Sequence, residues 1–146
     1  QVQRTTSSAV TTGATALPDD DTIPQIGEGD EYLNRAITAT SVINLLRITS
    51  LLNMAHSAAP LFVGIALFQD AAADALAATR ANLGDNAQMS QGSLAHVMRA
   101  GTVSATTLRI RAGSSTGATL TLNGIAGARK YGGVMASILV VEEIMA

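Results

Sequence analysis

Cysteine is absent from this chain of 146 residues, only four residues are aromatic, and charged residues make up 14% of it. The lack of cysteine excludes disulfides, thiolate metal sites and cysteine nucleophiles. Stability must therefore come from packing or from association. An average soluble domain has about 25% charged residues, so this chain has little polar surface with which to cover a lone monomer. We therefore expect an oligomer whose subunits cover part of one another.

Basic residues and long apolar runs are also scarce. The formal net charge is -2 and the isoelectric point is near 5.5, which gives no basic footprint for a nucleic-acid partner. The longest apolar stretches are Leu61–Phe68 and Ile138–Val141. Both are much shorter than the roughly 20 residues that a membrane-spanning helix needs. We expect neither nucleic-acid binding nor membrane insertion.

Alternating apolar and polar residues, cut by Gly- and Ser-rich turns, dominate the remainder. In the clearest example, Ala105–Ala112, the residues Thr106, Leu108 and Ile110 fall on one face of a strand. Similar segments are Glu31–Thr38, Leu45–Met54, Leu61–Phe68, Gln88–Arg99, Ala118–Asn123 and Val134–Ile144. Turns recur at intervals of about 8–12 residues, which is typical of sandwiches and jelly rolls.

The sequence therefore predicts an all-β protein, an antiparallel β-sandwich of seven to nine strands with a jelly-roll-like arrangement. Residues 17–146 are expected to form a single domain. Residues 1–16, rich in Thr, Ser, Ala and Gly, are expected to form an extended N-terminal arm or a loose first strand. Ala71–Leu83 is ambiguous, because its alanines favour helix while its Asp, Asn and Gly residues interrupt any stripe. We predict a long loop there with a short strand or a helical turn.

Two of the predicted strands are apolar on both faces. In Leu61–Phe68 neither face is polar, so both faces should be covered. The facing sheet would cover one face, and a loop or another subunit would cover the second. The same pattern occurs at Ile138–Val141. We therefore predict that subunit contacts involve Phe62, Phe68, Leu139 and Val141.

Candidate catalytic residues are few. His56 and Ser57 are neighbours, and adjacent side chains on extended backbone point apart, so they do not suit a nucleophile–base pair. We interpret His56 as a structural or surface residue and His96 as a strand residue, with a metal site at a three-fold axis as the alternative for His96. Asp19, Asp20 and Asp21 are interpreted as solvated turn carboxylates, with calcium binding as the alternative. We expect no enzyme activity, no metal and no cofactor.

Several phrases of the sequence resemble a β-rich domain of bacteriophage tail-fibre and other virion-associated proteins. The resemblance covers about residues 7–144. The phrases include Asp20–Gln25, Ala66–Asp70, Ser104–Thr107 with Arg111–Gly113, and Asn123-Gly124 followed by Gly127–Arg129 and Gly132-Gly133. The resemblance implies a jelly-roll-like sandwich, a homotrimer and no cofactor.

Three hypotheses follow for the function. The first is a structural module of a phage virion, in a tail fibre or related appendage, that contacts itself, other virion proteins and a host-surface glycan. Its contact residues would be Arg129, Lys130 and Tyr131, because an aromatic ring beside cations can stack on a sugar or pair with an anion. Arg109 and Arg111 would add an anionic-glycan or subunit contact, or form a solvated face.

The second hypothesis is a head decoration protein that clamps capsid subunits through residues 1–16. The third is an enzyme, such as a polysaccharide depolymerase domain. The absence of an evident acid–base constellation argues against the third hypothesis. Under the first two, the protein would lie on the surface of the virion.

Overall fold

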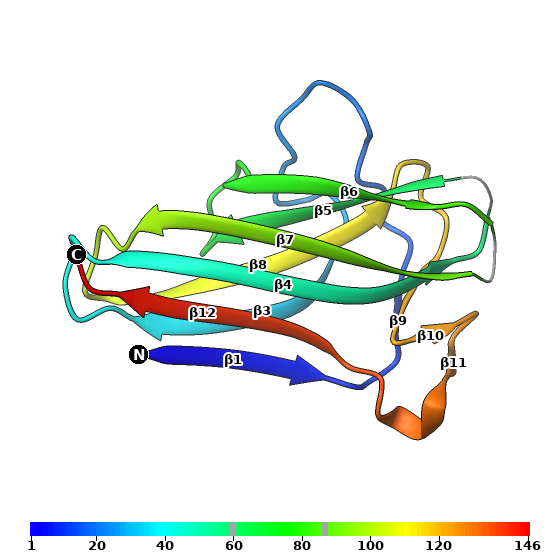
Figure 1. Cartoon of the computed structure of the whole chain (residues 1–146). Coiled ribbons are helices and arrows are strands. Elements are labelled where there is room, and N and C mark those ends of the chain that lie inside the picture. Colours follow the sequence, from blue (N-terminus) through cyan, green and yellow to red (C-terminus); the bar gives the residue numbers. More distant parts are fainter. Residues whose placement is uncertain (59–60, 86–87) are drawn as a thin grey trace.

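The computed structural model describes residues 1–58, 61–85 and 88–146. All of its strand pairings are antiparallel (Figure 1). In chain order the elements are β1 (Val2–Ser7), β2 (Thr11–Gly13), β3 (Asp30–Thr38), β4 (Leu45–His56), β5 (Leu61–Gln69), β6 (Ala77–Leu83), β7 (Met89–Arg99), β8 (Ala105–Ser114), β9 (Leu120–Leu122), β10 (Gly124–Ile125), β11 (Ala128–Arg129), the 3₁₀ turn η1 (Tyr131–Gly133) and β12 (Ser137–Ile144). Within the described ranges there is no helix with the length and apolar character needed to cross a membrane.

Eight strands of six or more residues among these elements form two facing sheets. The first sheet has the order β1-β12-β4-β7 and the second has the order β3-β8-β5-β6. Most consecutive long strands lie in opposite sheets, and this strand order is that of a jelly roll. The structure thus confirms the predicted antiparallel β-sandwich, and the number of long strands falls within the predicted seven to nine.

Residues of the predicted N-terminal arm take part in the first sheet. β1 pairs with β12 over six residues, from Val2 opposite Glu142 to Ser7 opposite Ser137. β2 pairs with the short strand β9, which in turn pairs with the end of β4. Of the two alternatives for residues 1–16, strand is therefore observed over Val2–Ser7 and Thr11–Gly13.

Both chain ends lie at the same end of the sandwich, away from β10 and β11 (Figure 1). The Glu143 amide donates to the Gln1 carbonyl at 2.9 Å. The Glu143 carboxylate accepts hydrogen bonds from the Asn44 side chain at 2.7 Å, the Gln1 side chain at 2.9 Å, and the Thr40 amide and hydroxyl at 2.7 and 2.8 Å. These bonds, led by the one from Asn44, hold the pKa of Glu143 at about 2.

The core lies between the sheets and uses the alternation that the sequence predicts. The inward faces of β4, β5, β8 and β12 supply its fully buried side chains: Leu46, Ile48, Leu52 and Met54; Val63, Ile65 and Leu67; Leu108 and Ile110; Leu139 and Val141. Ser50, the polar exception on the inward face of β4, is also fully buried. Its hydroxyl has no hydrogen-bond partner among the described residues.

The outer face of the second sheet is covered by the chain itself. Leu17, in the long loop between β2 and β3, packs against Ala66 and Phe68 of β5, with Ile26 and Ala75 at the margin. Glycine at position 113 permits this approach, since a Cβ there would lie 2.4 Å from the Thr15 carbonyl oxygen. Of the two covers that the sequence left open for β5, a loop is the one observed.

The residues predicted for subunit contacts need correction. Phe68, Leu139 and Val141 are fully buried within the chain, so their side chains cannot reach a neighbouring subunit. Phe62 is 37% exposed, and the Arg80 guanidinium lies 4.1 Å from the centre of its ring. The Arg80 group also pairs with Asp19 at 2.7 Å. On β12, the residues of the opposite parity face outward.

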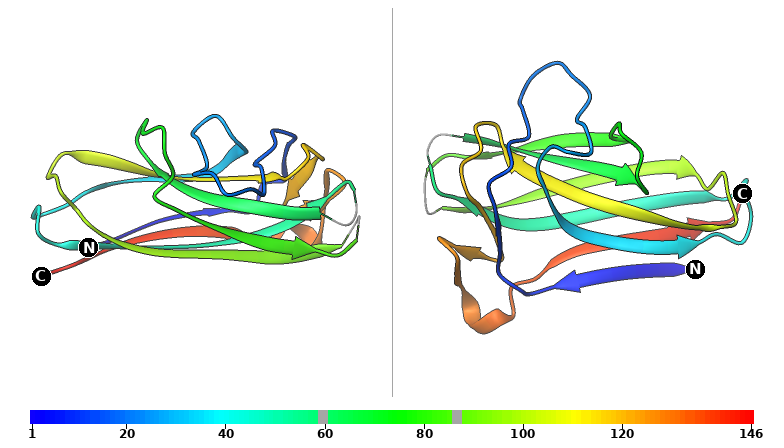
Figure 2. Two further views of the ribbon diagram at one scale, coloured as in Figure 1. Left: turned by 90° about the horizontal axis from the view of Figure 1, so that it is seen from above. Right: turned by 180° about the vertical axis from the view of Figure 1, so that it is seen from behind.

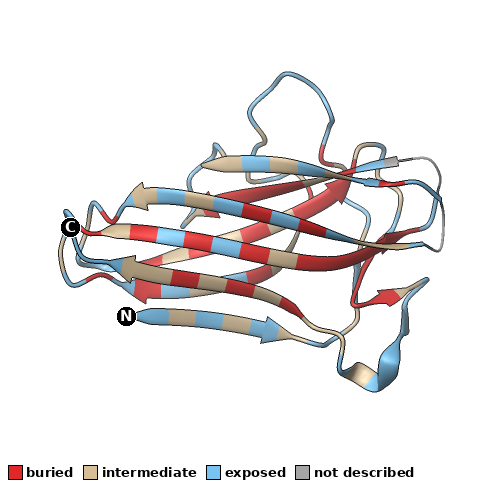
Figure 3. Cartoon of the chain, in the orientation of Figure 1, coloured by how far each residue is buried: buried red, intermediate tan, exposed pale blue. Residues whose placement is uncertain are grey.

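Within the described ranges no loop covers the middle of the outer face of the first sheet, whereas the segment 124–136 lies over the end of this face at Asn53. Figure 2 shows the long loops gathered over the second sheet, and Figure 3 shows exposed and half-buried residues along β1, β12, β4 and β7. Neighbouring outward residues are Ile138, Leu51 and Ser93, then Val140, Thr49 and Ala95, then Glu142, Arg47 and Val97. Val97 is 54% exposed. The middle of this bare face is apolar. Arg47 and Glu142, which also lie on it, form a salt bridge with each other at 2.5 Å.

The segment Ala71–Leu83 contains a full strand, where we predicted mainly loop. β6 pairs with β5 from Ala77 opposite Leu67 to Leu83 opposite Leu61. The pairing with β5 outweighs the helix preference of its alanines, because propensity is weaker than tertiary context.

Candidate binding site

The hairpin of β10 and β11 begins the segment that the sequence singled out. Gly124 pairs with Arg129 and Ile125 with Ala128. The two residues of the turn, Ala126 and Gly127, have φ of 50° and 75°. Positive φ at both central positions is the geometry of a type I′ turn, whose twist suits a two-residue hairpin. The glycine-rich phrase therefore serves turn geometry.

Tyr131 follows this hairpin and is held in an unusual conformation. Tyr131, Gly132 and Gly133 have φ of 49°, 62° and 92° in succession. A bulky residue in this left-handed region costs about 1–3 kcal/mol. Tyr131 is nevertheless 77% exposed, so its ring gains little packing within the chain in return. The turn thus exposes an aromatic ring to solvent, and the backbone conformation that does so lowers the stability of the folded chain.

A pocket of about 490 Å³ lies beside Tyr131 and joins segments that are distant in sequence. β4 and β7 supply one side of it, and the hairpin and η1 supply the other. The lining residues are Asn53, Met89, Ser90, Gln91, Ile125, Lys130, Tyr131 and Met135. The pocket therefore combines amides, a hydroxyl, a cation, a phenol and apolar side chains.

A network of buried amides and hydroxyls fixes the β4 side of the pocket. Asn53 is 8% exposed, and its side-chain nitrogen donates to the Ala136 carbonyl at 2.7 Å. Its side-chain oxygen accepts from Gln91 at 2.9 Å, and its backbone amide donates to the Ser137 hydroxyl at 3.0 Å. Ser137 in turn donates to Asn123 at 2.8 Å. A satisfied network of this kind makes the wall rigid.

The cations on the hairpin side lack carboxylate partners. Arg129 and Lys130 are exposed, and within the described ranges neither takes part in a salt bridge. The sequence explains this in part, because no Asp or Glu occurs between Asp85 and Glu142, whereas five Arg and Lys residues do. The hairpin segment, residues 124–133, therefore carries two cations and no carboxylate in a chain of net negative charge.

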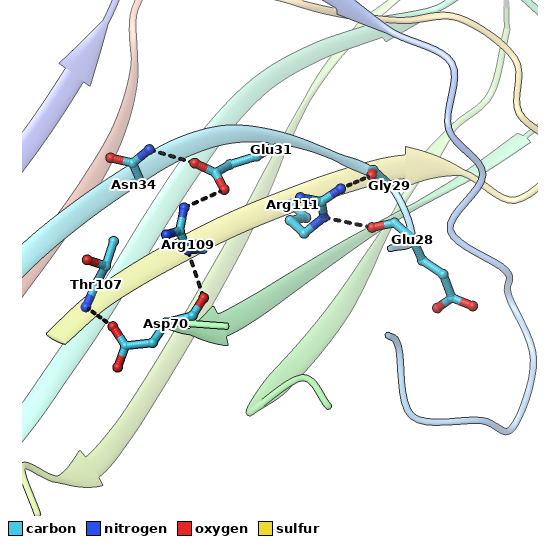
Figure 4. Close-up of polar contacts among 8 residues, drawn as sticks. All are labelled: Glu28, Gly29, Glu31, Asn34, Asp70, Thr107, Arg109 and Arg111. Atoms are coloured by element: carbon cyan, nitrogen blue, oxygen red, sulfur yellow. Dashed lines mark hydrogen bonds and ion pairs between the residues drawn. The ribbon is translucent and has the colours of Figure 1, made fainter. Parts of the chain in front are cut away.

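Arg109 and Arg111, for which we predicted a ligand or subunit contact or a solvated face, make hydrogen bonds within the chain. Arg109 donates to Glu31 at 2.9 Å and to the Asp70 carbonyl at 2.8 Å. Arg111 donates to the carbonyls of Glu28 and Gly29 at 3.0 and 2.6 Å. Figure 4 shows the Arg109 donors directed to Glu31 on β3 and to Asp70, and the Arg111 donors directed to Glu28 and Gly29 in the loop before β3. Their main contacts therefore fasten the loops that cover this sheet.

The histidines are placed as strand residues. His56 is buried, its Nε2 lies 3.0 Å from the Leu83 carbonyl and its Nδ1 accepts from the Ala58 amide at 3.2 Å. These partners suit the tautomer that carries its proton on Nε2. His96 is half-buried on β7, opposite Ile48. No group of three or more His, Asp or Glu in the described part of the chain is placed to hold a metal ion.

Sequence reasoning found the hairpin side of the pocket and missed the other side. Lys130 and Tyr131 line it as neighbours, whereas Arg129 is exposed next to them. Asn53 and Gln91 were not predicted as site residues. Their only signal was a polar residue within each of two strands, and nothing local connects them to a segment more than 30 residues away in the sequence.

No known protein family matches the chain, and no curated protein matches it. Among solved structures, a chain of infectious bursal disease virus, Gt strain, is 16% identical with a TM-score of 0.51, over 100% of this chain and 38% of that chain. A chain of T=1 particles derived from infectious bursal virus is 18% identical with a TM-score of 0.46, over 100% of this chain and 36% of that chain.

The C-terminal domain of EclA, described as a sugar-binding protein, is 16% identical with a TM-score of 0.42, over 80% of this chain and 74% of that chain. The present chain thus spans little more than a third of the virus chains. Only the likeness to the Gt-strain virus chain, with a TM-score above 0.5, bears on the fold of this chain. That likeness agrees with the jelly-roll order of the strands. The fold of this chain is one that occurs in a virus particle.

Proposed function

We propose that this protein is a structural module of a phage virion, in a tail fibre or a related appendage. It associates as a homotrimer through the bare face of its first sheet and carries no catalytic activity. Its hairpin end, with Arg129, Lys130 and Tyr131, faces a host-surface glycan. The protein then lies on the outside of the particle, in contact with other virion proteins.

The observation that carries this proposal is that a loop of the chain covers the outer face of the second sheet, whereas the middle of the outer face of the first sheet is exposed. Leu51, Ile138 and Val140 form a half-buried apolar strip on the bare face, and the exposed Val97 lies on the same face opposite Arg47. The outer face of the second sheet, by comparison, is closed by the chain's own loop. Low overall charge and a bare apolar strip together favour a second copy of this chain as the cover.

The sequence phrases shared with virion-associated domains support the same proposal, as does a jelly-roll fold. The decoration hypothesis is less well supported. It requires a free N-terminal arm, whereas residues 2–7 and 11–13 are paired with β12 and β9.

Light scattering on the purified chain tests self-association. The proposal predicts a mass of three times 14.9 kDa. Val97→Lys places a charge on the bare face without disturbing the core, and it should reduce the mass to that of one chain. Ala36→Lys, at an exposed position on β3, is the matched control and should leave the trimer intact. A wild-type monomer, or a Val97→Lys trimer, would contradict the proposed interface.

Mass spectrometry of separated head and tail fractions from purified particles tests the location. The proposal expects the chain in the tail fraction. Recovery in the head fraction alone would favour the decoration hypothesis instead.

A further inference from the structure

We propose that the pocket between the start of β7 and the turn η1 binds a sugar that carries an anionic group, either a carboxylate or a sulfate. The inference rests on the proposed attachment function and names its ligand class. It adds to the sequence-predicted residues a second wall made of Asn53, Ser90 and Gln91.

The charge balance at the pocket indicates an anionic ligand. Lys130 lines the pocket and Arg129 precedes it, and neither has a carboxylate partner in the described part of the chain. By comparison, Arg47, Arg80 and Arg109 each pair with a carboxylate of this chain. Cations left unpaired at a concave site are available to a negatively charged ligand.

The aromatic residue indicates a ligand with an extended apolar face. Tyr131 is 77% exposed and is held with φ of 49° beside the pocket. A glycine or asparagine would suit this backbone better. The contacts within this chain do not offset the cost of this conformation, so we expect the Tyr131 ring to contact a molecule outside the chain. The C–H face of a pyranose ring fits this contact, because Tyr offers a flat apolar surface with a polar tip.

The opposite wall supplies directional groups for hydroxyls. The Gln91 side chain is fixed by its 2.9 Å bond to Asn53, and its side-chain oxygen accepts no hydrogen bond within the described ranges. The same holds for the Ser90 hydroxyl, which lines the pocket. An acceptor and a hydroxyl on a rigid wall, opposite an aromatic ring, suit a ring with several hydroxyl groups. A volume of about 490 Å³ accommodates one or two sugar units.

Saturation-transfer NMR on the full chain tests the inference with matched sugars. The probes are the methyl glycosides of glucuronic acid, galacturonic acid and N-acetylneuraminic acid, with N-acetylglucosamine 6-sulfate. Methyl glucoside, methyl galactoside and N-acetylglucosamine are the neutral partners. We expect at least one acidic probe to bind tenfold or more tightly than its neutral partner.

Two variants locate the binding. Lys130→Gln should remove most of the preference for the acidic probe, and Tyr131→Asn should weaken acidic and neutral probes alike by about tenfold. Asn keeps a side chain that tolerates the left-handed conformation, so the fold is preserved. Arg99→Gln, at the far end of β7, is the control cation and should change neither property.

Equal binding of acidic and neutral sugars, or no binding across the whole panel, overturns the inference. A fall in the light-scattering mass of Lys130→Gln or Tyr131→Asn also overturns it, since the hairpin end would then be a protein interface. The Val97→Lys variant tests the proposed self-association independently of the sugar experiments. Failure of the sugar test therefore leaves the trimer test standing, and the reverse is also true.

Discussion

The two outer faces of this sandwich start from similar sequence patterns and end in different environments. The second sheet has Ala66 and Phe68 on its outer face, and Leu17 of the β2–β3 loop buries both. The first sheet has Ile138 and Val140 on its outer face, and both stay half-buried without a covering segment. An apolar outer face thus indicates that a cover exists but does not identify it.

The difference lies in what surrounds the strands. The loop over the second sheet is long, and glycines at 64 and 113 let it approach the strands closely, since a Cβ at Gly64 would lie 2.4 Å from Leu17 Cδ2. Arg109 and Arg111 then bind loop residues on the same side (Figure 4). In the described part of the chain, no such loop lies over Leu51, Ile138 and Val140 of the first sheet.

The largest expected contrast comes from trimming one apolar residue on each face. Phe68→Ala should lower the free energy of unfolding by about 3–5 kcal/mol, because it empties a fully buried site. Val97→Ala on the bare face should change it by no more than about 0.5 kcal/mol. Urea unfolding followed by circular dichroism, at concentrations where the chain is monomeric, measures both. Similar losses for the two variants would remove the contrast.

A smaller contrast separates two glycines of the covered side. Gly113→Ala should cost about 1–3 kcal/mol, because the added methyl meets the backbone of Thr15 and Leu17. Gly27→Ala is the control, since nothing lies within 4 Å of a Cβ there. Thermal unfolding of the two variants compares them. If Gly113→Ala were as stable as the wild type, the loop would not be docked as closely as the structure shows.

The smallest expected effect concerns the Glu143 carboxylate and its hydrogen bonds in the first sheet. The pKa of Glu143, at about 2, lies below its ordinary value of 4.5. A depressed pKa contributes stability that is fully present above about pH 4.5 and is lost as the pH falls toward 2. Glu143→Gln should therefore be slightly less stable than the wild type at pH 7, and the two should converge at pH 2. Melting temperatures across this range test the trend, and a constant difference at every pH would contradict it.

Most of the fold follows from local sequence patterns. On β8 the alternation placed Thr106, Leu108 and Ile110 on one face, and all three are buried, because a strand with one buried face has period two. β6 was harder, since Ala77, Ala78 and Ala81 favour helix in isolation. Only pairing with β5 makes that segment a strand, and pairing between strands is not a local property.

The interface and the site show where sequence reasoning ends. Leu139 and Val141 were assigned to a subunit contact, but alternation gives two faces without saying which one points inward. The structure turns these two inward, so the outward residues are Ile138 and Val140. Likewise, Lys130 and Tyr131 stood out locally, but Asn53 and Gln91 join them only through the topology of the sheets.

The shared position of the two chain ends has a practical consequence. Gln1 and Glu143 are hydrogen-bonded to each other at one end of the sandwich, and the hairpin with Tyr131 lies at the other (Figure 1). A biotin or an affinity tag at either end would therefore tether the molecule to a sensor surface in nearly the same orientation. In both cases the pocket would point toward the solution, so one immobilised format can serve for titrating soluble sugars with either tag.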